Sequence, residues 1–185
     1  MQALLISTAT VALAEIGDKT QLLSLILAAK YRKPWPICLG ILAATLVNHG
    51  IAGSVGALIA TWLTPEVQKW LVALSFLSVG LWTLKPDKAD EGEAARGAGH
   101  SVFVATLIAF FVAEIGDKTQ IATMVLAAQY HPLWQVVTGT TIGMLLANVP
   151  VVWLGSRFAA KLPLKAARIA AAILFVGLGL WILLR

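Results

Sequence analysis

Residues 15–21 read Glu-Ile-Gly-Asp-Lys-Thr-Gln, and the same seven residues recur at 114–120, each time inside an otherwise apolar stretch. Each copy places one Glu, one Asp and one Lys where the hydrocarbon of a membrane would surround them. Apart from Lys69 and Arg168, which lie within three residues of the ends of their spans, no other Asp, Glu, Lys or Arg falls inside a segment that we expect to span the membrane. Such charges cost roughly 2.5–3.5 kcal/mol each on insertion scales, so they persist mainly along protein-lined or watery ion paths. The repeated heptapeptide is therefore the predicted functional site.

The composition indicates an integral membrane protein. Of the 185 residues, 59% are hydrophobic and only 12% are charged, and the mean hydropathy is +0.84. These values exceed what a water-soluble domain normally carries. A helix needs about 20 residues to cross roughly 30 Å of hydrocarbon, so a chain of this length holds about six such helices.

The apolar segments predict an all-α integral membrane protein with six transmembrane helices. The expected spans lie near residues 3–29, 36–63, 67–84, 101–128, 133–156 and 166–184. Tryptophans mark many of the ends of these spans, as expected for amphipathic rings that favour the membrane interface.

The internal repeat extends well beyond the heptapeptide, at a constant offset of 99 residues between Glu15 and Glu114. The other positions that match identically at this offset include Ala28, Ala29, Tyr31, Trp35, Gly40, Gly56, Phe76, Gly80, Leu81 and Trp82. The sequence thus predicts a first three-helix repeat at 1–84, a polar cytoplasmic linker at 85–100 and a second repeat at 101–185. Because each half holds an odd number of spans, the halves are expected to be inverted, as in secondary transporters. A purely structural duplication is the alternative.

The basic residues predict how the chain is oriented in the membrane. Outside the two heptapeptides, ten of the twelve Lys and Arg residues flank the first, third and fifth connections between spans. These ten are Lys30, Arg32, Lys33, Lys85, Lys88, Arg96, Arg157, Lys161, Lys165 and Arg168, against Lys69 and Arg185 on the opposite face. The positive-inside rule then places these three connections in the cytoplasm and both termini outside. The net charge of +5 suits contact with the anionic lipid of the bilayer and requires no nucleic acid.

Within each heptapeptide the spacing suggests how the charged side chains are arranged. The Glu and the Asp are three residues apart, so they share a face if the segment is helical. The Lys, four residues after the Glu, can reach back to form a salt bridge with it, or it can change partners during ion exchange. Gly17 and Gly116 weaken the helix before each Asp, and they either permit a local break or allow tight helix crossing.

The carboxylates are the candidate cation ligands, namely Glu15, Asp18, Glu114 and Asp117. If the two heptapeptides meet, their four negative charges and the two lysines leave a net charge of −2, which matches one divalent cation or two protons. Carboxylates and amide oxygens suit Ca²⁺ and Mn²⁺, whereas zinc and copper sites more often contain clustered His or Cys. Binding of the cation and of protons at one carboxylate cluster is mutually exclusive, which is what the coupling of an antiporter requires.

Other polar residues lie where they would complete such a site. The supporting or proton-coupling candidates are Lys19, Thr20, Gln21, Lys118, Thr119, Gln120, Asn48 and Asn148. Ser24, Thr123 and His49 are nearby, and His49 is equivalent to Asn148 at the repeat offset. Each of these residues is either a hydrogen-bonding group between helices or a member of the site, and His49 is also a candidate proton carrier.

The chain resembles the Gdt one family of Ca²⁺/Mn²⁺ cation/proton antiporters, whose motif Glu-x-Gly-Asp-Lys/Arg-Thr/Ser occurs once in each of two three-helix halves. The resemblance covers essentially the whole chain. It implies that the four carboxylates bind the cation, that the Lys and Thr of each copy complete the motif, and that protons move in exchange. Because the family includes transporters of both ions, it leaves Ca²⁺ and Mn²⁺ open. For a short chain without an organelle-targeting segment, we expect Mn²⁺ export across a bacterial plasma (inner) membrane.

Three other functions are compatible with parts of the pattern. Asp18 and Asp117 on two helices would form an intramembrane aspartyl protease dyad, but each is followed by a Lys that favours ionisation of both carboxylates. A passive cation channel would need the same charged path. An exporter of a small organic cation or amino acid is the third alternative. We expect a transporter rather than an enzyme, with no cofactor beyond the transported ion.

Overall fold

Every regular element is an α-helix in the part of the chain that the computed structural model describes, which comprises residues 1–85, 100–155 and 163–184. The first half contains α1 (Gln2–Glu15), α2 (Lys19–Tyr31), α3 (Pro34–Trp62) and α4 (Pro65–Thr83). The second half contains α6 (Val102–Glu114), α7 (Lys118–Gln129), α8 (Leu133–Leu154) and α10 (Leu164–Leu184). The predicted all-α class is thereby confirmed for these residues. The linker predicted at 85–100 lies outside the described residues except for its two ends.

Two of the six predicted spans are divided into separate helices. The spans predicted over 3–29 and 101–128 each contain two helices, with α1 followed by α2, and α6 by α7, across short breaks. Gly17 and Gly116 lie in these breaks with φ of 81° and 74°, in the left-handed region that strains residues with a side chain. The predicted glycine break is therefore confirmed. Each half has the same order of two short helices followed by two longer ones.

The lengths of the helices place the breaks deep in the structure. By length and composition, α3, α8 and α10 are each long and apolar enough to cross a membrane. Helices α1 and α6 are apolar but have only 14 and 13 residues. At a rise of 1.5 Å per residue they are roughly 20 Å long, which is less than the ~30 Å hydrocarbon thickness of a bilayer. Their last residues, Glu15 and Glu114, therefore lie within the thickness of the protein.

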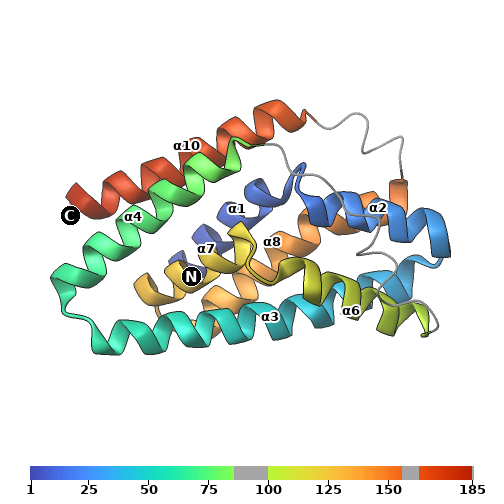
Figure 1. The fold of residues 1–185 in the computed structure, drawn as a ribbon, viewed down its shortest axis with the longest axis horizontal. Coiled ribbons are helices and arrows are strands. Elements are labelled where there is room, and N and C mark those ends of the chain that lie inside the picture. Colours follow the sequence, from blue (N-terminus) through green and yellow to red (C-terminus); the bar gives the residue numbers. More distant parts are fainter. Residues whose placement is uncertain (86–99, 156–162, 185) are drawn as a thin grey trace.

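The two halves pack against each other through equivalent contacts. Helix α1 packs on α8 and α6 packs on α3, while α3 and α8 also contact each other (Figure 1). Gly139 allows the first contact, because a Cβ atom there would lie 2.6 Å from the Leu4 carbonyl oxygen. Gly40, its equivalent, allows the second, because a Cβ atom there would lie 2.7 Å from Thr106. The same small residue thus permits close helix packing in both halves.

The last helices of the two halves, α4 and α10, form a pair on one side of the molecule (Figure 1). Their interface contains Phe76 and Phe175, which are equivalent in the repeat, fully buried and 6.1 Å apart between ring centroids. The pair contacts the rest of the protein unevenly, because α10 packs on α1 and α4 packs on α7. Helices α1 and α7 lie toward one end of the molecule, whereas α2 and α6 lie toward the other.

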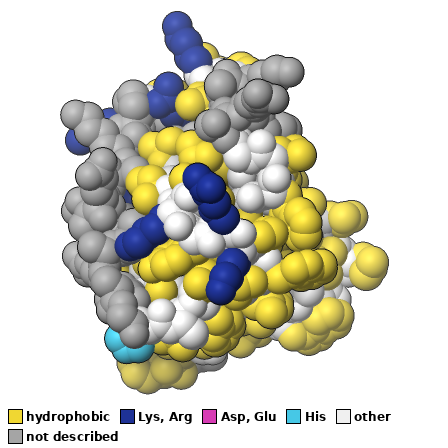
Figure 2. Space-filling view, turned by 90° about the vertical axis from the view of Figure 1, so that its right-hand side faces the viewer, with side chains coloured by type: hydrophobic (Ala, Val, Ile, Leu, Met, Phe, Trp, Pro, Cys, Tyr) yellow, Lys and Arg dark blue, Asp and Glu magenta, His cyan; other side chains and the backbone are white. Residues whose placement is uncertain are grey.

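The surface combines exposed apolar side chains with a basic end. Large apolar residues such as Leu39, Leu74 and Ile173 are exposed along the long helices, as expected where lipid replaces water. Figure 2 shows Lys and Arg side chains gathered on the right-hand face of the molecule, at the end where α2 is followed by α3. Among the basic residues used to predict the orientation, five lie outside the described residues: Lys88, Arg96, Arg157, Lys161 and Arg185.

Candidate metal centre

The two heptapeptides have nearly the same backbone conformation. In each copy the Glu ends a helix, the Ile is extended, the Gly is left-handed, and the Asp is the N-cap of the next helix. The Gln of each copy stabilises the break with its side-chain oxygen. Gln21 Oε1 accepts a hydrogen bond from the Gly17 amide at 2.9 Å, and Gln120 Oε1 accepts one from Gly116 at 2.8 Å. We expected the Glu and the Asp of each copy to share one helix face if the segment were helical. Because the segment is not a continuous helix, they do not share such a face.

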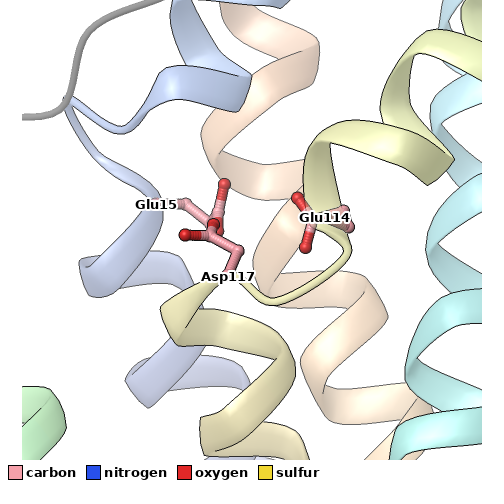
Figure 3. A group of neighbouring side chains, drawn as sticks. All are labelled: Glu15, Glu114 and Asp117. Carbon is pink, nitrogen blue, oxygen red and sulfur yellow. The ribbon is translucent and has the colours of Figure 1, made fainter.

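Three carboxylates from both halves converge at the breaks. Glu15 ends α1, Glu114 ends α6 and Asp117 occupies the N-cap position of α7, and their side chains point toward one another (Figure 3). One oxygen from each of the three lies within 4.8 Å of the other two. The exposed fractions are 0% for both glutamates and 3% for Asp117. We refer to these three residues as the carboxylate cluster.

The carboxylate cluster has the donor set of a cation site. Glu15 Oε1, Glu114 Oε1 and Asp117 Oδ2 are buried and accept no hydrogen bond from the described residues. Buried anionic oxygens without partners are strongly unfavourable unless a cation or protons neutralise them. Two oxygens bound to one ion at about 2.0–2.6 Å each lie no more than about 5 Å apart, which the cluster satisfies. The residues present therefore fit a hard divalent cation.

The fourth predicted ligand, Asp18, lies in an ion pair instead. Lys118 Nζ donates to Asp18 Oδ1 at 2.5 Å, and both side chains are almost completely buried. In the equivalent pair, Lys19 Nζ is 3.9 Å from Asp117 Oδ1, and the Lys19 side chain is 22% exposed. The predicted alternative of a salt bridge from each Lys back to its own Glu is wrong for the described structure. The helix break removes the helical turn that would bring each Lys to the Glu four residues before it. Each Lys pairs instead with the Asp of the other heptapeptide.

The threonines of both heptapeptides hold the glutamates in place. Thr20 Oγ1 donates a hydrogen bond to Glu15 Oε2, and Thr119 Oγ1 donates one to Glu114 Oε2 at 3.1 Å. In both glutamates the threonine bonds Oε2, and the other oxygen, Oε1, has no hydrogen-bond partner among the described residues. Each Thr therefore orients its Glu so that one oxygen remains available to a cation.

The predicted amide residues connect the heptapeptides to α3 and α8. Gln120 Nε2 donates a hydrogen bond to Asn48 Oδ1. The side-chain nitrogen of Asn48 in turn donates to the Phe111 carbonyl at 3.3 Å. Gln21 Nε2 donates to the Ala147 carbonyl at 2.9 Å. Asn148 accepts from the Ser24 hydroxyl at 2.7 Å. These hydrogen bonds tie both heptapeptides and α2 to the long helices of the two halves.

One residue outside the predicted ligand set also reaches the carboxylate cluster. His49 on α3 is fully buried, and its Nε2 lies 3.8 Å from Glu114 Oε2. The sequence offered a signal for it, because His49 is an ionisable residue in the middle of an apolar span and is equivalent to Asn148. The sequence alone did not distinguish an imidazole that bonds to a neighbouring helix from one that faces the site.

Comparison with known proteins identifies the family of this chain. The chain belongs to the GDT1 (Gdt one) family, described as divalent cation/proton antiporters, and residues 3–91 and 102–185 match the family profile. It is 55% identical over 177 residues to a Vibrio cholerae protein named "Putative manganese exporter", covering 95% of this chain and 88% of that protein. A GDT1-like protein of Synechocystis sp. is 30% identical over 89% of this chain and 88% of its own length. GDT1-like protein 5 of Arabidopsis thaliana is 25% identical over 96% and 93% of the respective chains. No solved structure matches the chain.

Proposed function

We propose that this protein is a secondary transporter that exports Mn²⁺ in exchange for protons. The observation that carries the proposal is the carboxylate cluster, in which both halves supply buried oxygens that have no hydrogen-bond partner among the described residues. Family membership supports cation/proton exchange, and the name of the Vibrio cholerae relative favours manganese. Ca²⁺ is the second cation with matching chemistry, because carboxylate oxygens are also its preferred ligands.

The charges around the breaks support exchange of one divalent cation for two protons. The Lys118–Asp18 pair is neutral as a unit. The three cluster carboxylates and Lys19 then carry −3 + 1 = −2. One Mn²⁺ or two protons bring this charge to zero, and both act on the same oxygens. Mutually exclusive occupancy of one site by cation and protons couples their movement.

The two halves would form an inverted repeat that exposes the cluster alternately to each side of the membrane. The equivalent contacts of Gly40 and Gly139, and the paired Phe76 and Phe175, support this relationship. The α4–α10 pair contacts α1 and α7. In an inverted repeat the corresponding contacts of the other state are α10 with α2 and α4 with α6. Movement of the α4–α10 pair between these two arrangements would then change which side reaches the cluster.

The apolar helices and the bacterial relative support a location in the bacterial plasma (inner) membrane, and the distribution of basic residues supports an orientation with both termini outside. The last turn of α2 and its connection to α3 carry Lys30, Arg32 and Lys33, at the end of the molecule where Figure 2 shows Lys and Arg side chains gathered. The positive-inside rule assigns that face to the cytoplasm. Export of the cation would then run from the basic face toward the opposite end.

The test is a flux measurement on the purified protein in proteoliposomes with an imposed pH gradient. Mn²⁺ and Ca²⁺ uptake and internal pH are followed together for the wild type and for Glu114→Gln. Glu66→Gln is the matched control, because Glu66 is exposed in the first turn of α4 and hydrogen-bonded to Trp70, away from the cluster. We expect metal flux that drives a reciprocal proton flux in the wild type and in Glu66→Gln, and loss of both fluxes in Glu114→Gln.

Two results would replace the proposal with the other functions compatible with the sequence. A metal flux whose rate does not depend on the pH gradient would identify a passive channel. The absence of flux for both ions in the wild type would favour an exporter of a small organic cation or amino acid.

A further inference from the structure

His49 is a buried imidazole that the described structure leaves without a hydrogen bond. Its exposed fraction is 0%, and neither Nδ1 nor Nε2 has a hydrogen-bond partner among the described residues. Buried polar groups in proteins are nearly always satisfied, and a neutral imidazole normally donates from one nitrogen and accepts at the other. The position of His49 therefore calls for a ligand that binds a nitrogen lone pair.

The position of His49 relative to the carboxylate cluster suits a shared cation. Its Nε2 lies 3.8 Å from Glu114 Oε2, which is longer than a hydrogen bond. The same distance is shorter than the separation of about 5 Å that two ligand atoms of one ion can have. Glu114 is one of the three members of the cluster, and its Oε1 has no partner in the described residues. A cation bound to Glu114 would therefore lie within reach of the imidazole after a small side-chain adjustment.

We propose that His49 is a nitrogen ligand of the transported ion and determines the preference for Mn²⁺ over Ca²⁺. This inference rests on the proposed function, because it assigns one more ligand to the same site. Ca²⁺ takes oxygen ligands, whereas first-row transition metals accept imidazole. Sites that combine Glu and His ligands hold manganese in helical carboxylate proteins. A mixed site of three carboxylates and one imidazole thus disfavours Ca²⁺ without excluding Mn²⁺.

The second half of the chain supports this assignment by contrast. Asn148 occupies the position equivalent to His49 at the offset of 99 residues. Both polar atoms of its side chain have partners, because Oδ1 accepts from the Ser24 hydroxyl and Nδ2 donates to the Met144 carbonyl at 3.0 Å. Only His49 of this equivalent pair has ring or amide atoms without partners in the described residues. His49→Asn therefore introduces the residue that the chain itself carries at the equivalent position.

Pulsed electron paramagnetic resonance on the full-length protein with bound Mn²⁺ tests the contact directly. A directly bound imidazole produces a ¹⁴N coupling on the Mn²⁺ signal, which oxygen ligands do not. We expect this coupling in the wild type and its loss in His49→Asn. His131→Asn is the control and should retain the coupling, because His131 is exposed, next to the start of α8. Mn²⁺ bound in the wild type without ¹⁴N coupling, or with coupling that survives in His49→Asn, would overturn the inference.

Competition transport in proteoliposomes tests the effect on selectivity. We expect the ratio of Mn²⁺ to Ca²⁺ flux to fall about tenfold or more in His49→Asn, since even residues that only support metal ligands change affinity by roughly ten- to a hundredfold. Ca²⁺ flux that continues in this variant would show that the carboxylate cluster is intact. An unchanged ratio with Mn²⁺ flux retained would mean that His49 only packs beside Glu114, and would overturn the inference while leaving the proposed function in place. A wild type that transports neither ion would instead overturn the proposed function.

Discussion

The two heptapeptide lysines are identical in sequence context, but the structure predicts that their removal has very different effects on stability. In Lys118→Met, Asp18 loses the ammonium group 2.5 Å away, in a site where both side chains are almost completely buried. Removing one partner of a buried ion pair costs about 3–5 kcal/mol because the remaining buried charge loses its counterion. In Lys19→Met, the lost pair is 3.9 Å long and the lysine is 22% exposed. Such a pair contributes about 1 kcal/mol or less after solvent screening.

The free energy of unfolding in detergent micelles measures this difference, with denaturant titrations followed by tryptophan fluorescence and extrapolated linearly. We expect Lys118→Met to be less stable than Lys19→Met by roughly 2–4 kcal/mol, the difference between a buried and a partly exposed pair. The double variant Lys118→Met/Asp18→Asn removes both charges and should recover most of the loss, because replacing a whole buried pair is often nearly neutral. Equal destabilisation by the two lysine substitutions, or no recovery in the double variant, would refute the reasoning.

Two further predictions concern helix packing and the orientation of a cluster glutamate. Gly40→Ala should lower the free energy of unfolding by about 1–3 kcal/mol through overpacking, because the new Cβ atom meets Thr106 at 2.7 Å. Gly177→Ala, with nothing within 4 Å, should leave it unchanged or slightly higher, and thermal unfolding of both variants compares them. Thr119→Val removes the hydrogen bond to Glu114 and should weaken Mn²⁺ binding roughly ten- to a hundredfold, as measured by calorimetric titration. Thr61→Val, which loses only an exposed bond within its own helix, should bind Mn²⁺ as the wild type does; equal affinity in both threonine variants would contradict the assigned role of Thr119.

Most of the secondary structure follows from local chemistry that the sequence displays. Apolar runs of about 20 residues predict helices, and the described residues contain no other regular element. The breaks at Gly17 and Gly116 were also predictable, because a glycine before a capping Asp weakens a helix whatever surrounds it. Hydropathy alone indicated single spans over 3–29 and 101–128, each of which contains two helices, because hydropathy does not register a backbone that turns for three residues and then resumes.

The composition of the site was predictable in kind but not in arrangement. Charged residues in an apolar segment are costly enough to mark a functional position without any structure, and this argument selected the two heptapeptides. Which carboxylates meet depends on how helices nearly 100 residues apart in the chain pack together. The cluster contains Glu15, Glu114 and Asp117, while Asp18 is held by Lys118. His49 joins this environment only because α3 packs against α6 and α7.

The amino-acid sequence alone determined the membrane class, the repeat, the positions of the helix breaks and the residue types of the site, because each depends on local hydropathy, backbone freedom or charge. The two heptapeptides are identical, so no argument from their sequence distinguishes Lys19 from Lys118 or Asp18 from Asp117. The difference arises in three dimensions, where the α4–α10 pair packs mainly on α1 and α7, and the corresponding contacts with α2 and α6 are not among the main contacts of the described helices. Unequal packing around equal motifs is what places one lysine in a tight buried pair and leaves the other partly exposed.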